Sequence, residues 1–416
     1  MNIIFFAIFL ILTVVGCREK KKDPPPPYAA QVLVLNTAER ADLPATYSLG
    51  DRSFSTLESL EKLEGRYFSV VYGGELSISD VEGSQVSKPS FKGGKSPLLR
   101  YNIEEGAIVP RDYTTLALLS AFYQLEQVFL NLESLLGVAA DTFLSINGKM
   151  KVLFEPSIVL RSGDTSAEVV IKLNAAYVPG DKQFVLFRRS AVEEVPIGLN
   201  LQVIAHEFGH AAFEQAFFKN QFDECSRFAR EHDIKGINEG FADVLSWAST
   251  GSADVLRGSF SIPEIADARN FSNLKFSYDD LFDNFGTEEK KCDGGIYCIG
   301  TLFASGILKA HQRMSRTNSF ADRSLTMRAV YDSLAKAQET MNQYPVWILP
   351  EKPASDCEAD ASSPSFLPNG PTVLGAFLTA FIQNSPAEMQ QHLCSAMLEN
   401  FGNSGFPIEA RAEVCQ

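Results

Sequence analysis

Residues 199–218 constrain the fold of this 416-residue chain more than any other segment, because they form an apolar helical pattern that also carries ionisable side chains. Apolar residues occur on all sides of this expected helix, which predicts burial all round rather than along one face. The helix nevertheless contains the sequence HEFGH at residues 206–210. Two histidines and a glutamate are costly to bury unless a partner such as a divalent cation balances them. A buried metal site is therefore the first hypothesis that the sequence raises.

The spacing within this sequence suits such a site. His206 and His210 are four residues apart, so on a helix they lie one turn apart on the same face and both imidazoles can reach one ion. Glu207 projects about 100° around the helix axis, where its carboxylate can contact a water molecule beside the ion without being a ligand. The same short pattern also arises by chance in surface helices, where the histidines are unrelated. The apolar surroundings favour the metal-site interpretation.

A second motif supplies the missing ligand. Residues 238–243, NEGFAD, begin another helical stretch and place Glu239 and Asp243 on one face. Catalytic zinc takes three protein ligands and leaves one position for water, so Glu239 is the candidate third ligand beside His206 and His210. Asp243 is placed to accept the second ring N–H of a ligating histidine. Helix capping plus a solvated face would explain the second motif alone, but the two motifs together predict one zinc ion.

With these residues the sequence resembles the glutamate-zincin peptidases of the thermolysin and fungalysin type, in which HExxH is followed by a helix with an Asn-Glu-x-x-Ser/Ala-Asp signature. The resemblance covers about residues 110–310. It implies a zincin-like, two-lobed fold, peptide-bond hydrolysis with Glu207 as catalytic base, and the three zinc ligands already named. It also implies Asp243 as the partner of His206, and Asn238 as a support of His210 through its backbone carbonyl.

A weaker match lies upstream, at residues 174–177. This sequence, NAAY, is similar to the edge-strand segment of the family, whose Asn and Ala bind substrate backbone; these correspond to Asn174 and Ala175. An exposed strand edge can pair with an extended peptide, so the role is physically reasonable. A strand end without any role is the alternative.

The donors that stabilise the oxyanion in the family are altered in this chain. Residues 294–297, GGIY, look like the family's Gly-Gly-x-His segment, and Tyr297 stands in place of that histidine. A phenol can donate the same hydrogen bond, so Tyr297 is the candidate donor. The family's second donor, a tyrosine ahead of the glutamate ligand, has no counterpart in residues 211–238. His232 is the candidate substitute, and a solvated loop histidine is the alternative.

The order of predicted elements indicates an α+β protein with a β-rich N-terminal lobe, a helical C-terminal lobe and the active-site helix between them. Strands are expected at 31–35, 67–72, 151–154, 168–173 and 183–187, with a turn at 179–181 that joins the last two. Helices are expected at 113–136, 199–218, 237–250, 298–314, 324–342, 370–383 and 386–399. The predicted regions are 28–110, either a pro-segment or part of the mature body, 111–218 as the N-lobe, and 219–416 as the C-lobe.

The N-terminus predicts export and anchoring. Residues 3–15 form an apolar run of signal-peptide length, followed by Gly16 and Cys17 in a sequence that resembles a bacterial lipobox. We therefore expect a signal peptide at 1–16, lipidation of Cys17, and a charged, proline-rich tether at 17–27. This predicts a protein of the bacterial cell envelope, anchored to a membrane and facing the periplasm or the exterior. An ordinary signal peptide with a chance cysteine is the alternative.

Charge and cysteines agree with such a location. The formal net charge of -14 argues against a nucleic-acid partner, because phosphate binding needs a basic surface. Without Cys17, six of the seven cysteines remain, which permits up to three disulfides in an oxidising compartment. Proximity favours Cys292–Cys298 and Cys394–Cys415. Acidic residues follow no EF-hand pattern, so the sequence neither predicts nor excludes bound Ca²⁺.

The sequence thus favours a zinc endopeptidase that acts on peptides or proteins. The competing class is a surface-anchored binding or adhesion module that keeps a zincin fold without effective catalysis. The changed oxyanion donors favour the binding module, whereas the intact Glu207 favours the enzyme, because a binder has no need of a carboxylate beside an open metal site.

Overall fold

The structure is a computed structural model. It describes residues 28–36, 46–80, 87–144, 148–162, 165–169, 175–178, 182–187, 195–218, 232–256, 259–260, 269–283, 296–342, 373–406 and Cys415. The predicted signal peptide, Cys17, the tether and Asn174 lie outside these residues. No helix within the described ranges has the length and apolar character needed to cross a bilayer.

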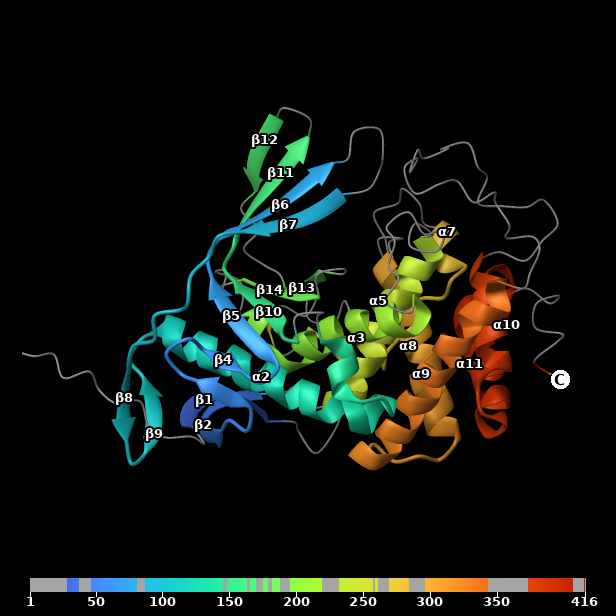
Figure 1. Cartoon of the computed structure of the whole chain (residues 1–416). Helices are drawn as coiled ribbons and strands as arrows, with labels where there is room; N and C mark the ends of the chain where they lie inside the picture. Colours follow the sequence, from blue (N-terminus) through green and yellow to red (C-terminus); the bar gives the residue numbers. More distant parts are fainter. Residues whose placement is uncertain are drawn as a thin grey trace, which may run out of the picture.

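The first part of the chain forms β-sheets. Its strands are β1 (Ala29–Asn36), β2 (Thr46–Ser53), β3 (Leu57–Ser59), β4 (Glu64–Gly65), β5 (Phe68–Tyr72), β6 (Glu75–Asp80), β7 (Ser87–Lys92), β8 (Tyr101–Glu104), β9 (Ala107–Pro110), β10 (Met150–Phe154), β11 (Ser157–Ser162), β12 (Thr165–Val169), β13 (Ala175–Val178) and β14 (Gln183–Leu186). Within the described residues, the largest sheet has the order β13-β14-β10-β5-β4-β3. Two four-stranded sheets, β12-β11-β6-β7 and β2-β1-β9-β8, lie on either side of it (Figure 1).

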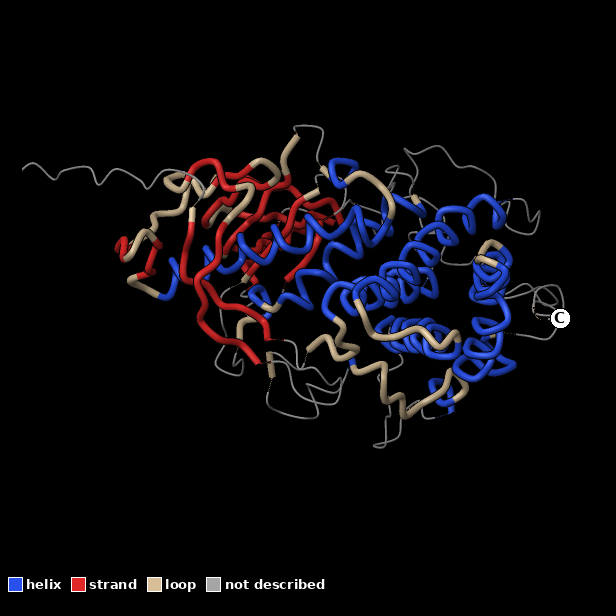
Figure 2. Tube along the Cα trace, turned by 90° about the horizontal axis from the view of Figure 1, so that it is seen from below, coloured by secondary structure: helices blue, strands red, loops and turns tan. Residues whose placement is uncertain are grey.

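The second part of the chain is helical. Its helices are α3 (Leu201–Phe217), α5 (His232–Thr250), α7 (Asp280–Asp283), α8 (Ile296–Arg313), α9 (Phe320–Asn342), α10 (Val373–Gln383) and α11 (Ala387–Gly405), whereas α2 (Tyr113–Leu136) lies between strands in the sequence. Figure 2 shows the strands gathered at one end of the molecule and most helices at the other. The predicted α+β class, with strands first and helices later, is confirmed.

Capping residues determine both ends of helix α2. The Asp112 side chain accepts a hydrogen bond from the N–H of Thr115 at 2.7 Å and caps the first turn. Gly137 ends the helix with φ of 74°, a left-handed conformation that glycine adopts without strain. Both bounds agree with the predicted range 113–136, because cap residues stand at each end.

The predicted hairpin around residues 179–181 is partly wrong. Strand β14 does pair antiparallel with the preceding strand, but that strand is β13, with Tyr177 opposite Phe184. Residues 165–169 instead form β12 and pair with β11. The β-branched residues at 169–171 favour a strand at 168–173. In the structure β12 and β13 belong to different sheets, and local propensity does not determine which sheet a strand joins.

Residues 28–110 contribute strands β3, β4 and β5 to the largest, or main, sheet. Strand β5 lies between β4 and β10, and its parallel register with β10 pairs Phe68 with Met150 and Val70 with Val152. Phe68 is fully buried and its ring contacts those of Phe122 and Phe208. The region therefore shares one core with helix α3.

Deleting residues 28–110 is accordingly expected to leave no folded protein, because β10 would lose its central partner and α2 its covering strands. Circular dichroism and solubility of the truncated chain would test this. A soluble, cooperatively melting product would favour the pro-segment interpretation instead.

Helix α3 lies between the two halves. It packs against β13 and α2 on one side and against α5 and α9 on the other (Figure 1). Glycines make the closest crossings possible: a Cβ at Gly209 would lie 2.3 Å from Cα of Ala242, and a Cβ at Gly240 would lie 2.4 Å from the carbonyl oxygen of Gly300. Helices α3, α5 and α8 can therefore approach one another almost backbone to backbone.

One of the two predicted disulfides is present among the described residues. Cys394 of α11 and Cys415 form a disulfide with a Cα–Cα distance of 5.6 Å, as predicted. Cys298 is also disulfide-bonded. Its predicted partner, Cys292, lies outside the described residues.

Candidate metal centre

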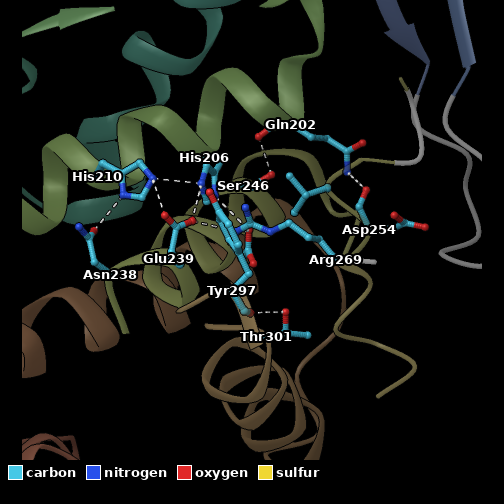
Figure 3. Close-up of polar contacts among 12 residues, drawn as sticks. Gln202, His206, His210, Asn238, Glu239, Ser246, Asp254, Arg269, Tyr297 and Thr301 are labelled. Atoms are coloured by element: carbon cyan, nitrogen blue, oxygen red, sulfur yellow. Dashed lines mark hydrogen bonds and ion pairs between the residues drawn. The ribbon is translucent and has the colours of Figure 1, made fainter. Parts of the chain in front are cut away.

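The start of α3 is fixed by a buried polar cluster. Asn200 is the N-cap, and its Oδ1 accepts hydrogen bonds from the N–H of Gln202 at 2.9 Å and from the hydroxyl of Tyr47 at 3.0 Å. Ser246 of α5 donates to the carbonyl oxygen of Gln202 at 2.8 Å (Figure 3). These contacts set the rotation of α3 and join it to α5, so the next turn of α3 directs His206 toward α5.

Three donor groups converge between α3 and α5. The Nε2 atoms of His206 and His210 are 3.1 Å apart. Oε2 of Glu239 lies 3.3 Å from Nε2 of His206, and Oε1 of Glu239 lies 3.8 Å from Nε2 of His210 (Figure 3). Ligands at about 2.0–2.1 Å from a tetrahedral zinc ion are separated by about 3.3 Å. The separations in the cluster are close to this value, and one donor atom from each of the three residues lies within 4.8 Å of the other two, so the group could hold a metal ion.

The outer nitrogens of both rings determine which nitrogens face inward. Nδ1 of His206 lies 3.0 Å from Oδ1 of Asp243, within ion-pair distance although not aligned as in a linear hydrogen bond. Nδ1 of His210 lies 3.0 Å from Oδ1 of Asn238. Because both neighbours are acceptors, a neutral ring at either position would carry its proton on Nδ1 and a lone pair on Nε2. With both rings neutral, two lone pairs 3.1 Å apart beside a carboxylate would repel one another, and a proton or a metal cation between them would remove that repulsion.

The two residues expected to support the histidines both lie beside them. Asp243 lies next to His206, as expected. Asn238 does contact His210, but through its side-chain Oδ1 and not through the backbone carbonyl that the family resemblance led us to expect. The difference follows from the helix: Asn238 lies within α5, where a backbone carbonyl points along the axis and the side chain points outward toward α3.

The electrostatics of the cluster favour positive charge. Burial and the Arg269 charge lower the pKa of His206, but its contacts with Asp243 and Glu239 outweigh them and raise that pKa to about 9. Burial raises the pKa of Glu239, yet His210, His206 and Arg269 together hold it well below its usual range. A buried, ionised carboxylate beside two imidazoles is the donor set that zinc prefers. The residues therefore fit the metal that the motifs imply.

Arg269 is part of this centre and was not predicted from the sequence. Its Nη2 donates to Oδ1 of Asp243 at 2.7 Å and to Oε2 of Glu239 at 3.3 Å, and its guanidinium lies 4.8 Å from the centre of the Tyr297 ring (Figure 3). No motif or periodicity surrounds it. The available signal was electrostatic, since two buried carboxylates one helical turn apart need more positive charge than two neutral histidines provide.

Glu207 faces the strand side of α3. Only 6% of its surface is exposed, and its Oε2 accepts a hydrogen bond from the backbone N–H of Tyr177 in β13 at 2.7 Å. Burial raises the pKa of Glu207, although the two neighbouring histidines and this N–H act in the opposite direction. A carboxyl group with a raised pKa can both accept and return a proton near neutral pH.

Three further residues were predicted to take part in the site: Ala175, Tyr297 and His232. Ala175 is buried in β13, which is the edge strand of the main sheet, and strand alternation directs its N–H and C=O to the same side as the N–H of Tyr177. Tyr297 is 52% exposed in the first turn of α8, and burial of the remainder, followed by the Glu239 charge, raises its pKa. Its hydroxyl is thus protonated at neutral pH. His232 is the first residue of α5, and its side chain lies outside what the structure describes.

Comparison with known proteins leaves this geometry as the main evidence. No family model matches the chain. No curated protein matches it either. Among solved structures it is similar to the precursor of protealysin, a metalloproteinase from Serratia proteamaculans, with 10% identity, a TM-score of 0.39, and coverage of 79% of this chain and 87% of that one. A likeness at that TM-score assigns neither family nor function.

Proposed function

We propose that this chain is a zinc-dependent endopeptidase. The observation that carries the proposal is the convergence of donor atoms of His206, His210 and Glu239 within 4.8 Å of one another, with the buried Glu207 close enough to interact with their charges. Bound zinc would act as a Lewis acid on the scissile carbonyl and would lower the pKa of a water molecule. The motif resemblance to glutamate-zincin peptidases supports the same reaction.

The residues of the chain would perform the proton transfers. Tyr177 holds Oε2 of Glu207, so Oε1 is the oxygen that would take the proton of the attacking water. The same carboxyl group would then deliver that proton to the nitrogen of the leaving amine. Because the pKa of Glu207 is raised by burial, protonation of the group in this cycle costs less than it would for an exposed glutamate.

Substrate would lie along β13. An extended peptide can add to this edge as a further strand, with the outward backbone groups of Ala175 as partners, and Asn174 remains the proposed neighbouring contact. Tyr297 would donate its hydroxyl hydrogen to the oxyanion that forms on the scissile carbonyl. Its half-exposed position beside Arg269 supports this role. His232 remains a candidate second donor.

The sequence also supports a proposed location. Lipidation at Cys17 would anchor the protein to a membrane of the bacterial envelope, and the tether at 17–27 would hold the catalytic body away from it. Its substrates would then be peptides or proteins of the periplasm or of the exterior, and the acidic surface argues against nucleic acid.

Metal content provides the direct test. The purified protein is expected to contain about one zinc per chain and to cleave casein. Cleavage should stop when a chelator removes the metal. Glu239→Ala should lose most of its zinc, because two histidines alone leave the site short of its third ligand. Glu133→Ala, which removes an exposed carboxylate of α2, is the matched control and should keep the metal. A Glu239→Ala protein with full zinc content would contradict the assignment.

The competing function is a surface-anchored binding module that retains the metal. One observation favours it: an exposed tyrosine stands where the family has its histidine donor. Zinc-containing wild-type protein that cleaves no peptide in a broad library would support this alternative and would exclude the peptidase.

A further inference from the structure

Tyr177 touches helix α3 at two points. Its backbone N–H donates to Oε2 of Glu207 at 2.7 Å, and its hydroxyl donates to Oε2 of Glu214 at 2.6 Å. The two glutamates are seven residues apart, hence on the same face of α3 and separated by about 10 Å along its axis. The tyrosine side chain therefore extends along the helix, and β13 lies beside α3 (Figure 1).

The contact at Glu214 is held in place by its surroundings. Glu214 is buried, and the ring of Tyr177 lies 5.6 Å from that of Phe184, which in turn lies 4.6 Å from that of Phe208 in α3. Burial, followed by the Glu214 charge, raises the pKa of Tyr177 well above its usual value, so the hydroxyl remains a donor. A charge-assisted hydrogen bond of this kind is stronger than one between neutral groups.

We propose that the Tyr177–Glu214 hydrogen bond positions Glu207 by fixing β13 against α3 at a second point. This inference rests on the proposed peptidase function. With one attachment, the strand could pivot about the Glu207 contact, and the carboxylate would move with it. With two attachments, the N–H of Tyr177 stays directed at Oε2, and the Glu207 carboxylate keeps its place next to the histidines. The same attachment fixes the strand edge that would hold the substrate.

A purely structural role for this pair predicts a different result. A stabilising hydrogen bond would change the melting temperature but not turnover of the folded protein, and any other buried side-chain hydrogen bond to a helix would do the same. Thr56 makes such a bond to α2 rather than to α3, because its hydroxyl donates to Oε1 of Glu126 at 2.6 Å. Thr56→Val, which keeps the backbone N–H, is therefore the matched control for Tyr177→Phe.

Kinetics of the zinc-loaded, full-length protein form the first arm of the test. Tyr177→Phe, which keeps the ring and the backbone N–H, should lower kcat about tenfold with KM changed less than about twofold, since small misplacements of a catalytic group lower turnover steeply. Glu214→Leu should lower kcat to a similar extent, because it removes the acceptor of the same hydrogen bond. Glu214→Gln, whose amide oxygen still accepts the hydroxyl hydrogen, should retain most of the wild-type kcat, and Thr56→Val should retain all of it.

Hydrogen–deuterium exchange of the segment 175–178 forms the second arm and requires no activity. Tyr177→Phe should speed exchange of the amide of residue 177 about tenfold, whereas Glu214→Gln and Thr56→Val should leave it near the wild-type rate. Unchanged exchange in Tyr177→Phe would overturn the inference, as would faster exchange with an unchanged kcat. If the wild-type protein cleaves nothing, the proposed function fails, and exchange alone then decides whether the attachment holds Glu207.

Discussion

Glu207→Gln is expected to lower kcat/KM for peptide cleavage by about 10²–10⁴-fold, the range that a general base contributes, while the zinc content stays unchanged. Glutamine has the same shape, and its amide oxygen can still accept the N–H of Tyr177. The side chain should therefore keep its place but be unable to take a proton from water. Cleavage of a fluorogenic peptide and elemental analysis of the same samples would measure both quantities.

A remote buried carboxylate serves as the control for this substitution. Glu126 in α2 accepts hydrogen bonds from Ser55 and Thr56 and is fully buried. Glu126→Gln should change stability and leave kcat/KM unchanged. If zinc-loaded wild type and Glu207→Gln cleave at the same rate, Glu207 is not the base and the proposed mechanism is wrong.

Gly240→Ala is expected to destabilise the fold by about 1–3 kcal/mol, as overpacking does, and to weaken zinc binding. The added methyl group would meet the carbonyl oxygen of Gly300 at 2.4 Å and its Cα at 2.9 Å. Both are backbone atoms, so α5 and α8 must separate. Glu239 precedes the glycine and would move with α5. Urea unfolding and metal content would measure the two effects.

The contrasting variant is Gly306→Ala, also within α8. Its new methyl group would lie 2.6 Å from Sδ of Met397, the end of a flexible side chain that can move aside. Both substitutions gain about 1 kcal/mol of helix propensity, so the difference between them isolates the backbone contact. Equal stability of the two variants would contradict the close-crossing explanation.

Features of the fold that depend on local contacts were predicted from the sequence, whereas features that depend on long-range contacts were not. Helix α2 was predicted residue for residue because Asp112 and Gly137 cap it locally. The cluster of His206, His210 and Glu239 was predicted because helical spacing fixes each half of it. The partner of β14 was predicted wrongly, since the strand expected at 168–173 was placed before the turn, whereas β13 pairs with β14. Local propensity does not determine which strand a sheet selects.

Other parts of the site depended on contacts that no local pattern encodes. Arg269 reaches Asp243 from 26 residues further along the chain, with no periodicity to indicate it. The hydrogen bond from Tyr177 to Glu214 joins a strand to a helix across 37 residues. The side chain of Asn238, rather than its backbone, meets His210 because α5 presents that face to α3.

Arg269 also bears on which ions the centre can accept. Glu207, Glu239 and Asp243 carry three negative charges when ionised, and one guanidinium leaves two of them uncompensated. A doubly charged ion would bring this enclosed region to neutrality, whereas a singly or triply charged ion would leave a residual charge in a medium that solvates charge poorly. Valence selection would thus arise from an arginine that binds no ion itself.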